Sequence, residues 1–140
     1  MAICLNLLET LIAGRALERF AMIEKWNLCR LEELPESDSK GFAFKADALY
    51  ADIFIVRTRN GLYAYRNRCP HTGAPMESLP DDFMNYQKQF IQCAIHGAQF
   101  QVEDGYCWSG PCQGRYLEKV TVDVQEGVVV ALESLSGRRG

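Results

Sequence analysis

Short runs of alternating hydrophobic and polar residues, separated by turn residues, recur along the chain from residue 26 to residue 132. Such alternation is typical of β-strands that bury one face. Asn60-Gly61 lies between two apolar runs and predicts a β-hairpin with a tight turn. The predicted strands cover residues 26–31, 41–45, 52–57, 62–66, 89–93, 100–103, 106–108, 119–124 and 128–132. Short strands at this spacing predict an all-β fold, a small antiparallel barrel or sandwich.

The first 21 residues follow a different pattern. Apolar side chains recur there at steps of three and four, which predicts an amphipathic helix; they are Leu5, Leu8, Ile12, Ala16 and Phe20. The opening has no basic residue and Glu9 interrupts the apolar run, so a secretory signal peptide is not expected. Met22 reads as a natural start. Residues 1–21 are therefore either an extension from a misassigned start codon or a helix that docks on the domain or on a partner.

Length and composition predict one globular domain at residues 22–133. The chain has 140 residues, of which 48% are hydrophobic, and a chain of this length buries roughly two-thirds of its unfolded surface. Residues 134–140 are polar and contain glycine, so a flexible tail is expected there. The net charge of −3 does not favour nucleic acid as a partner. No uncharged apolar run is long enough to span a membrane.

Two short segments each contain one cysteine and one histidine, and together they contain both histidines of the chain. The segments are Cys69-Pro70-His71-Thr72-Gly73-Ala74 and Cys93-Ala94-Ile95-His96-Gly97-Ala98. Each segment follows a predicted strand, so we expect two loops at the ends of hairpins to meet at one metal centre. Gly73 and Gly97 let the backbone of each loop come close to a bound group. Pro70 stiffens the first loop because its ring fixes one backbone angle.

The ligand types alone suit either tetrahedral zinc or an iron–sulfur cluster. Zinc fingers usually pair cysteine with cysteine and histidine with histidine, whereas each pair is mixed in this chain. A mixed pair can give its sulfur to one iron and its nitrogen to another, as in a Rieske [2Fe–2S] centre. The spacing C-x-H…C-x-x-H resembles that of the Rieske family, and the resemblance runs from about residue 26 to residue 132.

The resemblance implies a Rieske-like fold with one [2Fe–2S] cluster per chain, bound by two hairpin loops within about residues 66–112. It implies that Cys69 and Cys93 hold one iron of the cluster. By the same resemblance, His71 and His96 hold the other iron.

Further residues are expected beside the cluster. Gly73, Gly97 and Ala98 belong to the two ligand loops. In Rieske-like domains a proline-bearing loop covers the cluster, and the resemblance assigns this role to Gly110 and Pro111. An ordinary turn is the alternative for these two residues.

Four positions depart from the Rieske proteins of cytochrome complexes. Those proteins have cysteines at the places of Ala74 and Ile95, which form a disulfide between the ligand loops, and this chain cannot form it. They also have a serine and a tyrosine at the places of Ala98 and Phe100, whose hydroxyls bond to cluster or ligand sulfur. Hydrogen bonds to sulfur stabilise the reduced state, so their loss predicts a low potential, roughly −150 mV.

The remaining cysteines indicate the compartment. Six cysteines without a secretion signal favour a reducing, cytoplasmic location, because disulfide frameworks belong mainly to secreted proteins. Cys107 and Cys112 flank the expected covering loop and are predicted to be free thiols. A disulfide between them, or a separate redox switch, is the alternative. Cys4 and Cys29 are interpreted as small apolar residues.

These features favour an electron carrier, a freestanding Rieske ferredoxin, rather than an enzyme. By the resemblance, it would take an electron from a flavin-dependent reductase and pass it to a terminal oxygenase or a similar acceptor. The chain has no further histidine for the mononuclear iron of a ring-hydroxylating oxygenase. Two alternatives remain: a Rieske-like small subunit of a nitrite-reductase-type complex, and an interaction module in which zinc holds the two loops.

Overall fold

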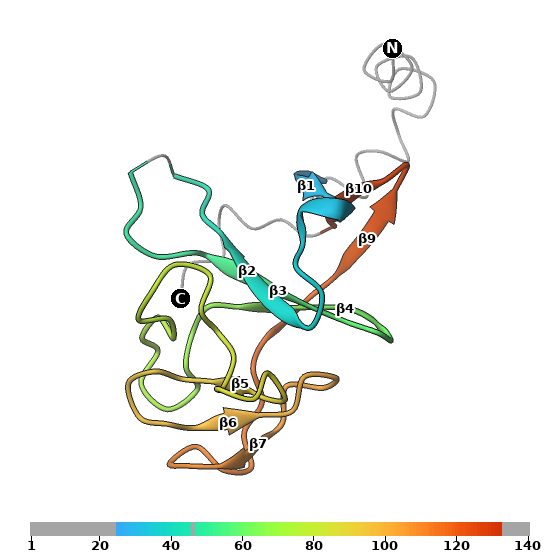
Figure 1. Cartoon of the computed structure of the whole chain (residues 1–140). Helices are drawn as coiled ribbons and strands as arrows, with labels where there is room; N and C mark the ends of the chain where they lie inside the picture. The colour runs from blue at the N-terminus through green and yellow to red at the C-terminus, as the bar shows by residue number, and fades with distance from the viewer. Residues whose placement is uncertain (1–24, 46, 133–140) are drawn as a thin grey trace, which may run out of the picture.

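The computed structural model describes residues 25–45 and 47–132, and this part of the chain is all β apart from the one-turn 3-10 helix η1 (Leu31–Glu33) (Figure 1). The first sheet has the order β1 (Trp26–Arg30), β10 (Val128–Ala131) and β9 (Val122–Gln125). The second sheet has the order β2 (Asp38–Phe42), β3 (Ile53–Thr58), β4 (Gly61–Arg66) and β8 (Lys119–Val120). The third sheet has the order β5 (Ile91–Gln92), β6 (Gln99–Phe100) and β7 (Cys107–Ser109). All these strand pairs are antiparallel, which confirms the predicted fold class.

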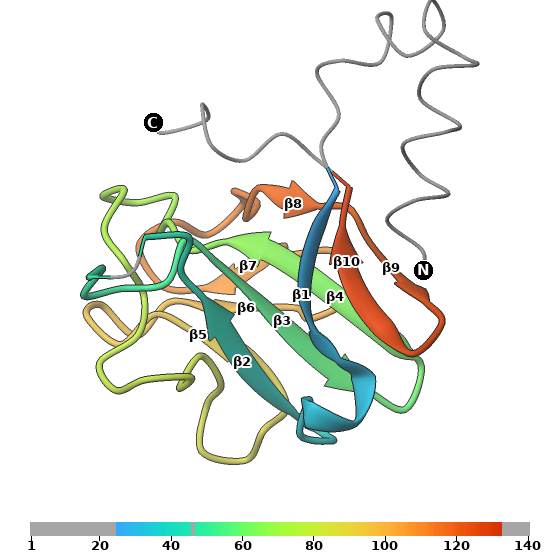
Figure 2. The ribbon, with the colours of Figure 1, turned by 90° about the horizontal axis from the view of Figure 1, so that it is seen from above.

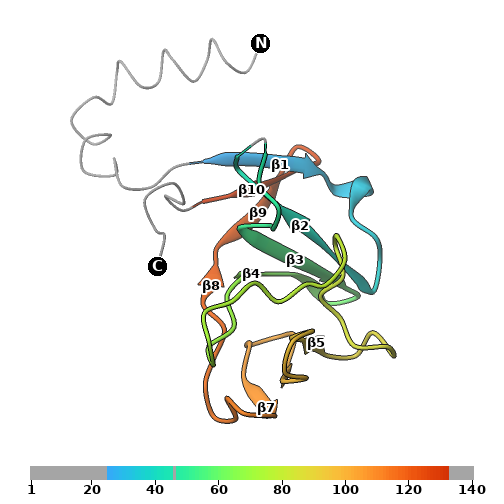
Figure 3. The same cartoon turned by 90° about the vertical axis from the view of Figure 1, so that its left-hand side faces the viewer.

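The second sheet lies between the other two. Figure 2 shows β1, β10 and β9 beside the strands of the second sheet. Figures 1 and 3 show the β5–β7 sheet at the opposite end of the molecule from β1 and β10. The connections between β4 and β8 contain both cysteine–histidine segments.

The middle strand β3 separates two hydrophobic cores. Successive side chains of a strand point to opposite faces. Ile53 and Ile55 therefore enter the core beneath β1 and β10, while Phe54 and Val56 enter the core beneath the third sheet. All four are fully buried, which explains why β3 has a continuous apolar run instead of an alternating one.

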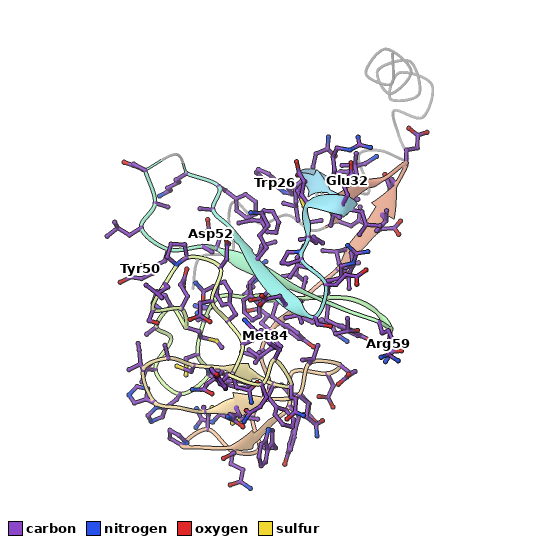
Figure 4. All side chains as sticks on the ribbon, viewed as in Figure 1. Trp26, Glu32, Tyr50, Asp52, Arg59 and Met84 are labelled. Carbon is purple, nitrogen blue, oxygen red and sulfur yellow. The ribbon has the colours of Figure 1, made fainter. Side chains whose placement is uncertain are left out.

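We call the second of these cores the loop-side core. Its residues come from the second sheet, from the third sheet and from the connections: Phe54, Val56, Tyr65, Cys69, Met76, Phe83, Met84, Ile91, Cys93, Ala98, Phe100, Val102, Cys107, Cys112 and Leu117. Phe83 stacks on Phe54 with ring centroids 4.3 Å apart. Met84, labelled in Figure 4, forms an isolated bridge to Ile91 of the third sheet. These apolar contacts fix the connection that leads to the second cysteine–histidine segment.

Most strand boundaries differ from the prediction by a few residues, and three differences have a clear cause. β2 begins at Asp38 and not at residue 41, because its backbone pairs with β3 over the whole length from Asp38 to Phe42. The predicted strand 119–124 is divided into β8 and β9, which belong to different sheets. The predicted strands 100–103 and 106–108 become the shorter pair β6 and β7, because a turn occupies the residues between them. In this turn the N–H of Gly105 donates to Gln101 O and the N–H of Gln101 donates to Tyr106 O.

Two predictions concern residues outside those described by the structure. They are the amphipathic helix in residues 1–21 and the tail at residues 134–140. In residues 25–45 and 47–132 no helix is long and apolar enough to cross a membrane.

Candidate metal centre

The first cysteine–histidine segment forms a tight loop after β4. The N–H of Cys69 donates to Ala74 O at 2.9 Å, and the N–H of Gly73 donates to Cys69 O at 2.7 Å. Gly73 has φ +80°, a left-handed conformation that favours glycine. The loop therefore reverses direction directly after His71 and returns to its own start.

The second segment repeats this backbone pattern after β5. The N–H of Cys93 donates to Ala98 O at 2.9 Å, and the N–H of Gly97 donates to Cys93 O at 2.9 Å. Gly97 has φ +73°, close to that of its counterpart in the first loop. The shared spacing Cys-x3-Gly-Ala thus produces two loops of the same shape, although the histidine lies two residues after the cysteine in one and three in the other.

The two loops bring three of the candidate ligands into one group and place the fourth, His71, beside His96. The sulfurs of Cys69 and Cys93 and a ring nitrogen of His96 all lie within 4.8 Å of one another. The rings of His71 and His96 meet edge to face, with centroids 4.8 Å apart. Both cysteines are buried and both histidines are exposed. The thiols thus lie on the protein side of the site and the imidazoles on its solvent side.

The pKa of the buried Cys93 thiol differs from that of a free cysteine. Burial raises the pKa of the Cys93 thiol, and the neighbouring Cys69 raises it further. The backbone N–H groups of His96 and Ile95 point to the Cys93 sulfur and act in the opposite direction. Those N–H groups offset the rise only in part, so the Cys93 thiol holds its proton more firmly than a free cysteine does. Metal binding therefore displaces this proton.

A buried polar network holds the start of the first loop. The Asn67 side chain donates to Glu77 Oε1 at 2.6 Å and to Ala51 O at 2.9 Å. Its Oδ1 accepts the N–H of Met76 at 2.8 Å. Met76 O in turn accepts the N–H of Ala94 at 2.8 Å, which connects the network to the second loop.

Replacing Asn67 by alanine should destabilise the domain by about 3 kcal/mol, because it leaves Glu77 and the Met76 N–H buried without this partner. Urea denaturation of the metal-free protein measures the free energy of unfolding. Asn27 is exposed on β1 and provides the control, since Asn27→Ala should change that energy by less than about 0.5 kcal/mol. Equal effects of the two changes would contradict a supporting role for the network.

A third loop, which we call the cap (residues 107–115), covers the two ligand loops. A Cβ atom added to Gly110 would lie 2.6 Å from the Cα of Ala98. Only glycine therefore fits where the cap contacts the second loop. Arg115 donates from Nη1 to Pro70 O at 2.9 Å and so contacts the first loop. Pro111 is exposed at the tip.

The cap itself contains two further thiols. Cys107 and Cys112 are free and buried, with their sulfurs 3.2 Å apart. Burial, the contact with Cys107 and the charge of Cys69 raise the pKa of Cys112 to about 12. Cys112 therefore lies within electrostatic reach of a candidate ligand.

Sequence reasoning missed two residues of this site, Asn67 and Arg115, whereas it named Cys112 as a free thiol beside the covering loop. Asn67 precedes the motif by two residues and could have been found as a polar residue at the end of an apolar strand. Nothing in the sequence indicates the contact of Arg115 with Pro70, because the two residues are 45 positions apart.

The donor set fits a [2Fe–2S] cluster with two thiolates on one side and two imidazoles on the other. A family model described as the Rieske [2Fe-2S] domain matches residues 24–133. The chain belongs to the Rieske [2Fe–2S] family. It therefore holds one [2Fe–2S] cluster, and the alternative of a zinc-stabilised module is wrong. A Rieske cluster exchanges one electron at a time, so the chain is an electron-transfer protein.

Three solved structures of carbazole 1,9a-dioxygenase components share the fold of this chain. A chain of the complex of reduced oxygenase and oxidized ferredoxin in carbazole 1,9a-dioxygenase matches with a TM-score of 0.59 and 23% identity, over 77% of this chain and 92% of that chain. The ferredoxin of carbazole 1,9a-dioxygenase from Nocardioides aromaticivorans IC177 matches with a TM-score of 0.57 and 19% identity, over 76% and 95% of the two chains.

The terminal oxygenase of carbazole 1,9a-dioxygenase from Novosphingobium sp. KA1 matches with a TM-score of 0.63 and 19% identity, over 87% of this chain and 35% of that chain. At these identities the likeness concerns the Rieske fold alone. A search of curated protein sequences found no match to the chain.

Proposed function

We propose that Cys69 and Cys93 bind one iron of the cluster and that His71 and His96 bind the other. The support is the convergence of two buried thiols and two exposed imidazoles from loops with the same backbone hydrogen bonds. An imidazole that binds through one ring nitrogen keeps the other nitrogen free to hold a proton. Both free nitrogens would then lie on the solvent side of the site.

We also propose that the domain works as a freestanding ferredoxin in the cytoplasm. It accepts one electron from a flavin-dependent reductase and gives it to a terminal oxygenase or a similar acceptor. The exposed pair of His71 and His96 carries this proposal, because it offers an electron a short route from the buried sulfurs to a docked partner. The similarity to a structure of an oxygenase–ferredoxin complex supports the choice of acceptor.

Anaerobic electron transfer with defined partners tests the proposal. The purified protein is mixed with NADH and a catalytic amount of a flavin-dependent ferredoxin reductase, and its visible absorbance is recorded. We expect bleaching by one electron per chain and recovery of the absorbance when an oxidised Rieske oxygenase or cytochrome c is added. A protein that takes up no electron from dithionite, or whose absorbance recovers with neither acceptor, would contradict a carrier.

Replacing Ala98 by serine should raise the reduction potential, because the resemblance to Rieske proteins places a hydroxyl at this position within reach of sulfur, where it donates more strongly to the reduced state. Ala98 is fully buried, so the hydroxyl is shielded from water. A gain of about 1.5 kcal/mol for the reduced state corresponds to about 65 mV for one electron. A spectroscopic redox titration measures the midpoint.

The control for this change is Ala131→Ser. Ala131 is equally buried but belongs to the other hydrophobic core. Its replacement should leave the midpoint unchanged. If Ala98→Ser leaves the midpoint unchanged as well, the ligand sulfur does not lie where we place it.

A further inference from the structure

The cap contains a pair of thiols arranged for bond formation. The sulfurs of Cys107 and Cys112 are 3.2 Å apart, and the Cys107 thiol also donates to Ser109 O at 3.3 Å. A disulfide requires a sulfur–sulfur distance of about 2.0 Å. The two atoms therefore need to approach by only about 1.2 Å.

The backbone of the cap is already closed around this pair. The N–H of Cys107 donates to Arg115 O at 2.8 Å, and the N–H of Gly114 donates to Cys107 O at 2.9 Å. Gly110 with φ +110° and Gly114 with φ +94° make the two sharp turns of the loop. Hydrogen bonds and glycines thus hold the ends of the pair together before any covalent bond is made, so ring closure costs little further chain entropy.

We propose that Cys107 and Cys112 are a reversible disulfide site, oxidised by small disulfides of the glutathione class. Both sulfurs are buried, so the exchange takes place when the cap opens locally. One thiolate of the pair then attacks the small disulfide, forms a mixed disulfide and releases the first small thiol. The second protein sulfur then attacks the mixed bond and releases the second small thiol. Two electrons pass from the pair to the small disulfide, and the two protons of the protein thiols go to the two released thiols.

The location of the pair connects it to the metal centre. Gly110 contacts Ala98 in the second ligand loop and Arg115 contacts Pro70 in the first, so the cap that carries the pair rests on both loops. Cys112 also shares the loop-side core with Cys69. Disulfide formation removes the S–H group of Cys112, which lies close to the sulfur of Cys69, and the cluster midpoint should shift to a more negative value. This consequence rests on the proposed ligand set, whereas the disulfide itself does not.

Mass spectrometry of the cluster-loaded protein tests the proposal. The protein is incubated anaerobically with oxidised glutathione, quenched in acid, alkylated under denaturing conditions and digested with trypsin. Residues 89–115 form one tryptic peptide, which contains Cys93 as well as the pair. We expect this peptide to lose two hydrogens and to carry one alkyl group, on Cys93. After treatment with dithiothreitol it should carry three.

Cys29 provides the internal control, because it is a free, half-buried thiol among aliphatic side chains of the other core. It should remain open to alkylation or take a glutathione adduct. In the variants Cys107→Ser and Cys112→Ser, the loss of two hydrogens should disappear. Alkylation of both cap thiols after oxidation, or a glutathione adduct on each, would overturn the proposal.

The iron content measured on the same samples separates this proposal from the proposed function. A protein without iron that still forms the bond would contradict the carrier and leave the disulfide site standing. A protein with two iron atoms per chain that does not form the disulfide would overturn the disulfide site and leave the carrier standing. In loaded protein that does form the bond, a midpoint that stays constant would overturn the coupling of the pair to the cluster.

Discussion

Replacement of Cys93 by alanine should abolish the cluster. The Cys93 sulfur lies within 4.8 Å of the Cys69 sulfur and of a His96 ring nitrogen, and it is fully buried. Water cannot easily replace a thiolate there, so one iron loses one of its two protein ligands. The cluster is then no longer held at this iron. Iron and acid-labile sulfide should fall from two each per chain to near zero, and the visible absorbance should disappear.

Two controls separate ligation from general damage to the fold. Cys29→Ala removes a half-buried thiol from the other core and should leave the iron content unchanged. Cys93→Ser keeps the size of the side chain and, if it holds any iron, should do so with an altered spectrum. A Cys93→Ala variant with full iron content and an unchanged spectrum would show that this residue is not a ligand.

Replacement of Gly110 by valine should lift the cap from the second ligand loop. The new Cβ would lie 2.6 Å from the Cα and 2.9 Å from the Cβ of Ala98, and φ is +110° at this position. Overpacking costs about 1–3 kcal/mol and backbone strain a similar amount. We therefore expect the domain to lose about 3 kcal/mol of stability and the cluster to be released faster. The rate of bleaching at a fixed temperature measures the second effect.

Gly114 is the matched control for this change. It has φ +94°, but a Cβ added there meets no heavy atom within 4 Å. Gly114→Val therefore carries the backbone strain without the clash, and it should cost about half as much stability. If both variants bleach at the same rate, contact between Gly110 and Ala98 does not protect the cluster.

Features that depend on neighbouring residues in the chain were predictable. Asn60-Gly61 forms the hairpin between β3 and β4, with Thr58 paired with Gly61. The repeated spacing of cysteine, glycine and alanine gave two loops that meet at one point. In both cases a short segment contains the turn chemistry that decides the local backbone, so no distant contact is needed to fix it.

Features that depend on distant contacts were not predictable. Glu77 is a charged residue, and only its hydrogen bonds with Asn67 and the Ala51 N–H explain its burial. Cys107 and Cys112 were predicted to be free thiols, but the short distance between their sulfurs depends on how the cap folds. Such contacts are formed by packing of connections whose conformation the hydrophobic pattern does not determine.

Mössbauer spectroscopy of the reduced protein, enriched in ⁵⁷Fe, tests the central claim most directly. If Cys69 and Cys93 hold one iron while His71 and His96 hold the other, the two irons have different ligands and one added electron localises on one of them. We predict two equally populated iron sites, one ferric and one ferrous, with the ferrous site bound by nitrogen. A single iron site, two sites with the same sulfur environment, or zinc in place of iron would contradict the account.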